Sequence, residues 1–124
     1  MKRDLDLIRS ILLDIESVPS NKLSVYDVAE KHQVPADLVM YQLIILSEAG
    51  FIKLRGLTIA FTPNTRKYDD IKIERLTLHG HDYLDTIRND TVWKKTLQKI
   101  EAVGPSVAFE LVSKIASHFI DELF

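Results

Sequence analysis

One stretch near the middle of the chain, residues 38–52 with the sequence LVMYQLIILSEAGFI, constrains the fold more than any other. Its apolar residues are spaced for a helix as far as Ala49. Gly50 then suits the left-handed conformation that commonly ends a helix, and the apolar residues after it favour a strand. The stretch therefore predicts a helix that passes through one glycine directly into a β-strand.

Two shorter helices are predicted before this stretch. Apolar residues at spacings of three and four indicate a helix over residues 4–16. Ser24 is a suitable N-cap for a second helix, and Asp27 three residues later nearly matches a capping box. A turn at residues 32–34 would follow, with Pro35 at the first position of the third helix.

Strands and further helices are predicted after it. Residues 51–55 and 57–61 resemble strands, residues 71–76 alternate with period two, and residues 62–70 form a polar loop between them. Thr77 would cap a helix that ends near Asn89, a helix over residues 91–103 would stop at Gly104-Pro105, and Ser106 would cap the last helix. The last helix carries one apolar stripe, formed by Ala108, Leu111, Val112, Ile115, Phe119 and Leu123.

This order of elements predicts an α+β, mostly α fold. Three helices, a strand pair and a further helix resemble the winged helix-turn-helix superfamily, as do the passages LIILSEAGFIKL and RLTLHGHDYL. We therefore expect a winged helix-turn-helix domain over residues 1–88 with additional C-terminal helices. The helical extension, residues 89–124, would pack on that domain or form a dimer interface.

A second resemblance covers most of the chain. The passages MKRDLDLIRSILLDIE, LTLHGHDYLDTIRNDTVW and GPSVAFELVSKIA are similar to an uncharacterised family of bacterial and prophage proteins. The resemblance implies a small cytoplasmic protein that is often carried by mobile elements. It implies no established activity.

Composition excludes several classes of function. The chain has no cysteine, so disulfides, thiolate metal sites and cysteine nucleophiles are ruled out. No signal peptide and no membrane span are predicted, which favours the cytoplasm. Sixteen Lys and Arg against eighteen Asp and Glu do not suit a protein that coats nucleic acid, although a local basic patch remains compatible with these numbers.

A cluster of metal-ligand residue types follows the predicted strands: His79, His81, Asp82 and Asp85. A third ligand at suitable spacing is missing, so we favour a structural interpretation in which Gly80 allows close packing and His81 is hydrogen-bonded. His32 and His118 each stand alone and are expected at the surface. No nucleophile elbow or phosphate-binding loop is present. The sequence predicts no enzyme, no metal and no cofactor.

The third predicted helix is poorly suited to reading DNA bases. Its core side is predicted to hold Leu38, Val39, Gln42, Leu43, Leu46 and Ala49. Its outward side is predicted to hold Asp37, Met40, Tyr41, Ile44, Ser47 and Glu48. The outward side has no Lys or Arg, whereas a helix in the major groove usually offers cationic or amide side chains to base edges.

The predicted strand pair is more basic. Between residues 51 and 76 it contains Lys53, Arg55, Arg66, Lys67, Lys72 and Arg75 against Asp69, Asp70 and Glu74. The residues predicted to bind nucleic acid are Arg55, Arg66, Lys67 and Lys72. They could follow a phosphate backbone, or they could be solvated residues that protect the edges of the sheet.

Two functions therefore stay open. The first is a non-enzymatic winged-helix regulator of bacterial or prophage origin that associates with double-stranded DNA. The second is a protein-binding module, such as a phage accessory or anti-defence protein, that presents Asp37, Met40, Tyr41 and Ile44 to a host or phage protein. A homodimer formed through the C-terminal helix is compatible with both.

Overall fold

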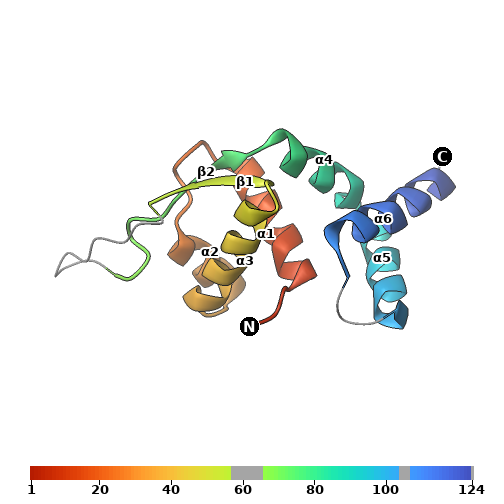
Figure 1. Ribbon diagram of the computed structural model, residues 1–124, viewed down its shortest axis with the longest axis horizontal. Coiled ribbons are helices and arrows are strands. Elements are labelled where there is room, and N and C mark those ends of the chain that lie inside the picture. The colour runs from red at the N-terminus through yellow and green to blue at the C-terminus, as the bar shows by residue number, and fades with distance from the viewer. Residues whose placement is uncertain (57–65, 104–106, 124) are drawn as a thin grey trace. The chain divides into compact units, whose positions relative to one another are not determined.

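The computed structural model describes residues 1–56, 66–103 and 107–123 (Figure 1). Within these residues the chain forms six helices and one two-stranded antiparallel sheet, which confirms the predicted α+β, mostly α class. The elements are α1 (Leu5–Ser17), α2 (Val25–His32), α3 (Ala36–Glu48), β1 (Ile52–Arg55), β2 (Lys72–Leu76), α4 (Leu78–Ile87), α5 (Asp90–Val103) and α6 (Phe109–Leu123). The predicted strand over residues 57–61, part of the polar loop and the predicted stop and cap at residues 104–106 lie outside the described residues.

The chain divides into two compact units, Met1–His81 and Asp82–Phe124. The division lies inside α4. None of the helices in the described part of the chain has the length and apolar character needed to cross a lipid bilayer.

The first helix is capped and tied to α3 by side chains. Asp4 is the N-cap of α1, and its carboxylate accepts a hydrogen bond from the Leu7 amide at 3.0 Å. Gln42 of α3 is fully buried; its Oε1 accepts from the Asp4 amide at 2.9 Å, and its Nε2 donates to the Lys2 carbonyl at 3.0 Å. The buried amide therefore has partners for both of its polar atoms, and it fastens the N-terminal segment to α3.

The helix pair α2 and α3 follows its local signals closely. The Ser24 hydroxyl and the Asp27 carboxylate form both bonds of the predicted capping box. Gln33 ends α2 in the left-handed region, with φ of 55°. Pro35 is the N-cap of α3, one position before the first helical position predicted for it. Gly50 has φ of +78° after α3, as predicted.

The β1–β2 sheet packs one face on the helices. Ile52 pairs with Leu76 and Leu54 with Ile73, and this inward face contacts α1 and α3. Gly80, at the start of α4, lies so close to the start of β1 that an added Cβ would sit 1.9 Å from the Phe51 carbonyl oxygen. The predicted close packing at Gly80 is therefore confirmed.

The second unit contains α5 and α6, which contact each other. Val112 and Ala116, one turn apart on α6, are fully buried. Leu111 and Leu123, two members of the predicted apolar stripe, are 40% and 45% exposed. The stripe was thus wrong in part, because the buried face of α6 is centred on the small residue Ala116, which the stripe had omitted.

Candidate nucleic-acid interface

The outward face of α3 differs from the prediction at Met40. Met40 is only 5% exposed and belongs to the core, so its prediction as a surface residue was wrong. Ala49, predicted inside, is exposed. Because α3 contacts α1, α2 and β1, its buried arc is rotated toward Met40 and away from Ala49.

The remaining outward face of α3 carries no cation. Asp37 and Glu48 are exposed, Ile44 is 37% exposed, and Tyr41 is half-buried. These four residues recur at helical spacing and form one stripe. Two carboxylates would meet phosphates unfavourably here, so α3 itself offers little to a DNA groove.

The outward face of the β1–β2 sheet is different. Lys53 pairs with Arg75 and Arg55 with Lys72 in the register of the two strands, and all four are exposed. Directly paired residues share a face of a sheet, so these four cations form one surface, named here the cationic face. Arg55 also forms an ion pair with Glu74, Nη2 to Oε1 at 2.6 Å.

A β-bulge creates this arrangement. Strict alternation along β2 would put Lys72 and Arg75, three residues apart, on opposite faces. The register shifts between Lys53 and Leu54, which inserts Glu74 as an extra residue in β2. Lys72 and Arg75 consequently share the outward face. Bulges often occur beside functional sites, where they redirect a side chain.

The cationic face has a cost for folding. Like charges directly opposite each other across two strands are destabilising. The pairs Lys53 with Arg75 and Arg55 with Lys72 are both of this kind, and Glu74 with 21% of its side chain exposed is the one carboxylate that forms an ion pair with them among the described residues. An anionic partner would remove this repulsion.

Arg66 and Lys67, also predicted to bind nucleic acid, lie in a separate group. Arg66 Nε is 3.1 Å from Asp69 Oδ1, and its guanidinium lies 3.9 Å from the centre of the Tyr26 ring. Lys67 Nζ is 3.7 Å from Asp37 Oδ1. Each of these cations is already paired with a carboxylate, so a phosphate would have to displace an internal partner.

Tyr68 fastens this group to the helices. Its side chain is buried, its hydroxyl donates a hydrogen bond to Asp37, and its amide donates to the Tyr26 hydroxyl at 2.9 Å. The Tyr68 hydrogen bond and the nearby Lys67 charge lower the pKa of Asp37. The same hydrogen bond from its hydroxyl to Asp37 raises the pKa of Tyr68. Asp37 thus anchors the described end of the predicted polar loop, and it is only partly available to an outside partner.

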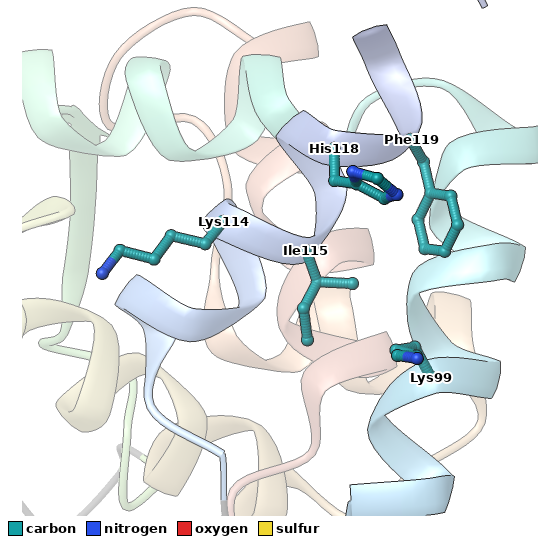
Figure 2. Close-up of a pocket in the computed structure, with 5 residues that line it drawn as sticks. All are labelled: Lys99, Lys114, Ile115, His118 and Phe119. Carbon is teal, nitrogen blue, oxygen red and sulfur yellow. The ribbon is translucent and has the colours of Figure 1, made fainter. Parts of the chain in front are cut away.

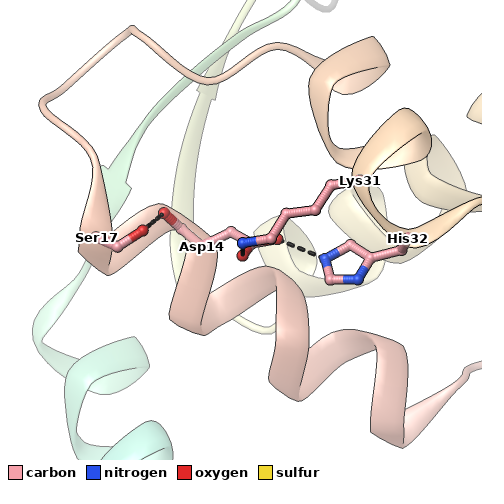
Figure 3. Close-up of polar contacts among 4 residues, drawn as sticks. All are labelled: Asp14, Ser17, Lys31 and His32. Carbon is pink, nitrogen blue, oxygen red and sulfur yellow. Dashed lines mark hydrogen bonds and ion pairs between the residues drawn. The ribbon is translucent and has the colours of Figure 1, made fainter.

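A buried carboxylate was missed by the sequence analysis. Asp14 of α1 is 6% exposed; its Oδ1 lies 2.6 Å from Lys31 Nζ and its Oδ2 lies 2.6 Å from His32 Nε2 (Figure 3). His32, predicted to stand alone, is therefore part of a polar cluster between α1 and the end of α2. Ser17 bonds to the Asp14 carbonyl at 2.8 Å, away from the histidine. The cluster links two helices.

The histidine and aspartate residues around α4 do not converge on a site. His81 has 51% of its side chain exposed, and its Nδ1 lies 4.0 Å from Glu16 Oε2. Asp85 accepts a hydrogen bond from Arg88 at 2.9 Å. Nowhere in residues 1–56, 66–103 and 107–123 do three histidine or carboxylate side chains gather as a metal site requires.

Comparison with known proteins shows the family. The chain belongs to the family described as "Hypothetical protein (DUF2513)", whose model matches residues 2–106. An "Uncharacterized protein" of Haemophilus influenzae is 30% identical over 123 residues, which cover 99% of this chain and 98% of that relative. No solved structure matches the chain. The predicted resemblance to an uncharacterised family is confirmed.

Proposed function

We propose that this member of the family is a non-enzymatic winged helix-turn-helix protein that associates with double-stranded DNA through the cationic face of its β1–β2 sheet. The order of α1, α2, α3, β1 and β2 supports a winged helix, as do the tight turn at Gln33 and the passage from α3 through Gly50 into β1. In this proposal the β1–β2 sheet belongs to the wing, the antiparallel strand pair that follows the helices in a winged helix-turn-helix domain. The protein would act as a regulator of bacterial or prophage origin in the cytoplasm.

The observation that carries the proposal is the cationic face. Two cross-strand pairs of like charge are retained there at a cost to stability, and a bulge aligns them. By contrast, the first unit as a whole has eleven Lys and Arg and eleven Asp and Glu. The positive charge is therefore concentrated locally, as a phosphate backbone requires, and it does not reflect a basic protein.

The proposed contacts are with phosphates. Lys53, Arg55, Lys72 and Arg75 would follow one strand of the backbone, with Glu74 releasing Arg55 to a phosphate. Such contacts position a protein on DNA without specifying sequence. Because α3 offers no cation and Met40 is buried, selectivity for one DNA sequence would depend on other contacts, such as Tyr41 or the shape of the groove.

The test is fluorescence anisotropy of the full chain with duplex DNA that flanks its own gene and with random duplex, at low and physiological salt. A regulator should bind its own flanking DNA about a thousandfold more tightly than random duplex. Each phosphate contact contributes about 0.9 to the slope of log affinity against log salt. The double variant Lys53→Ala/Lys72→Ala should lower that slope by about 2.

A variant with the same change of charge provides the control. Lys94→Ala/Lys95→Ala alters two exposed lysines of α5, outside the first unit, and should leave the slope unchanged. If both double variants lower the salt slope equally, the protein and DNA attract each other without a specific site. Absence of binding to either DNA at low salt would contradict the proposal.

A second candidate is a protein-binding module, which the outward face of α3 favours. Of the four residues predicted to bind a partner, Asp37, Tyr41 and Ile44 remain, since Met40 is buried. Carboxylates and apolar groups without a cation suit a protein surface better than DNA. If the protein is a protein-binding module, the double variant Tyr41→Ala/Ile44→Ala should abolish its activity. If Arg66 and Lys67 contact DNA, the double variant Arg66→Ala/Lys67→Ala should abolish it instead. Light scattering would test the proposed homodimer in either case.

A further inference from the structure

The second unit contains a cavity of about 310 Å³ lined by residues of α5 and α6 (Figure 2). Ligand sites in proteins commonly occupy roughly 300–1,000 Å³, so this cavity is at the small end of that range. The lining residues are Lys99 of α5 and Lys114, Ile115, His118 and Phe119 of α6. The cavity is therefore built entirely within residues 82–124.

Most of the surface that lines the cavity is apolar. Ile115 and Phe119 are one helical turn apart on α6 and are both half-buried. In Figure 2 both side chains point toward α5, on the side where Lys99 lies, whereas Lys114 extends away from the other four residues. A ligand in the cavity would therefore meet the Ile115 and Phe119 side chains and, at their edge, the Lys99 side chain.

Two lysines, Lys99 and Lys114, line the cavity, and a third, Lys95, lies beside it. Lys99 forms no ion pair with another described residue, and Lys95 Nζ lies 5.9 Å from the centre of the Phe119 ring. Two carboxylates of α6 are paired with lining residues. Glu122 Oε1 lies 3.2 Å from His118 Nε2, and Glu110 Oε1 lies 3.9 Å from Lys114 Nζ. Within the described part of the chain the Lys99 ammonium thus has no ion-pair partner, and it lines the same cavity as the apolar side chains of Ile115 and Phe119.

We infer that this cavity binds a small amphipathic carboxylate. The hydrocarbon part of the ligand packs on Ile115 and Phe119, and its carboxylate pairs with Lys99, within reach of Lys95. A charge-assisted bond beside an apolar surface is stronger than one between neutral groups. A neutral ligand of the same shape loses that bond, and a cationic ligand is repelled. The inference is independent of DNA binding by the first unit.

The probe is octanoate, compared with octan-1-ol as an uncharged ligand of the same chain length. Calorimetry gives the affinities for the full chain, and ¹H–¹⁵N spectra locate the site. We expect octanoate to bind about tenfold more tightly than the alcohol, with shifts concentrated at Ile115 and Phe119. Equal affinities, no octanoate binding at millimolar concentration, or shifts centred elsewhere would overturn the inference.

Variants separate the charge from the apolar surface. Lys99→Ala, at an exposed position, should weaken octanoate binding about tenfold and leave the alcohol unaffected. Phe119→Ala should weaken both ligands, with circular dichroism reporting whether the helices persist. Lys94→Ala, an exposed lysine of α5 that does not line the cavity, is the matched control. The site is wrong if Lys99→Ala and Lys94→Ala have the same effect.

Discussion

Lys53 of β1 lies directly opposite Arg75 of β2 on the outward face of the sheet. Two residues of the same charge in this arrangement repel each other, and the neighbouring pair of Arg55 and Lys72 adds a second repulsion. The fold retains both pairs, although opposite charges are in general the favourable combination at directly paired positions. We interpret this as a surface kept for an anionic partner.

Reversing one charge should therefore stabilise the protein and weaken DNA binding together. Lys53→Glu places a carboxylate opposite Arg75 and should raise the free energy of unfolding by about 0.5 kcal/mol at low salt. Urea unfolding at low and high salt measures the change, which should shrink as salt screens the charges. Lys94→Glu gives the same change of charge outside the first unit. A loss of stability in Lys53→Glu alone would argue against repulsion in this pair.

The alignment of cations on the cationic face could not be predicted from the sequence. Period-two alternation over residues 71–76 was predicted, and it puts Lys72 and Arg75 on opposite faces. The bulge at Glu74 breaks that alternation, and nothing in the six residues reveals it, because a bulge is set by the pairing with β1. The bulge therefore accounts for Arg75, which alternation separates from Lys72. Lys53 shares the face of Arg55 by simple alternation, so its absence from the predicted interface is not explained by the bulge.

Local signals, in contrast, predicted the first three helices well. Ser24 and Asp27 are three residues apart, and Gly50 follows its helix directly, so each acts through the backbone next to it. The Asp14 and Tyr68 contacts join residues 18 and 31 positions apart along the chain. Such contacts depend on how the helices pack, and the sequence does not display that packing.

The bond between Tyr68 and Asp37 should make stability depend on pH. Its hydrogen bond lowers the pKa of Asp37 from the usual 3.8, so the contribution of the carboxylate is present above that pH and is lost as pH falls through the lowered value. Because the pKa of Tyr68 is raised, the phenol form contributes fully to the free energy of unfolding below pH 10.0, the usual pKa of tyrosine. This contribution is lost as pH rises through the raised pKa. The pair therefore stabilises the fold at pH values between the lowered pKa of Asp37 and the raised pKa of Tyr68.

Removing the Tyr68 hydroxyl tests this window. Tyr68→Phe should be less stable than the natural protein near neutral pH, and the difference should shrink as pH falls through the lowered pKa of Asp37 and as pH rises through the raised pKa of Tyr68. Denaturant unfolding across this range gives the measurement. Tyr41→Phe, on the outward face of α3, is the control and should show no such profile. A difference that stays constant from acid to alkali would exclude the proposed linkage.

Asp14 should be the more important member of its cluster. Its carboxylate is buried and is bonded to both Lys31 and His32, so Asp14→Ala leaves both side chains without this partner and should cost about 1–3 kcal/mol of folding free energy. Lys31→Ala should cost about 1 kcal/mol or less, because 61% of that side chain is exposed. Urea denaturation compares them, and a double-variant cycle with His32→Ala measures the coupling. Equal costs for Asp14→Ala and Lys31→Ala would contradict this assignment.

Met40 and Ile44 separate the core of α3 from its surface. Met40 is 5% exposed, so Met40→Ala should lower the free energy of unfolding by about 2–5 kcal/mol through the cavity it leaves. Ile44 is 37% exposed, and Ile44→Ala should change the free energy of unfolding by about 0.5 kcal/mol or less. Chemical denaturation of the two variants measures these free energies. If Ile44→Ala removes binding of a protein partner while stability is retained, the outward face of α3 is an interface; a large loss of stability would instead place Ile44 in the core.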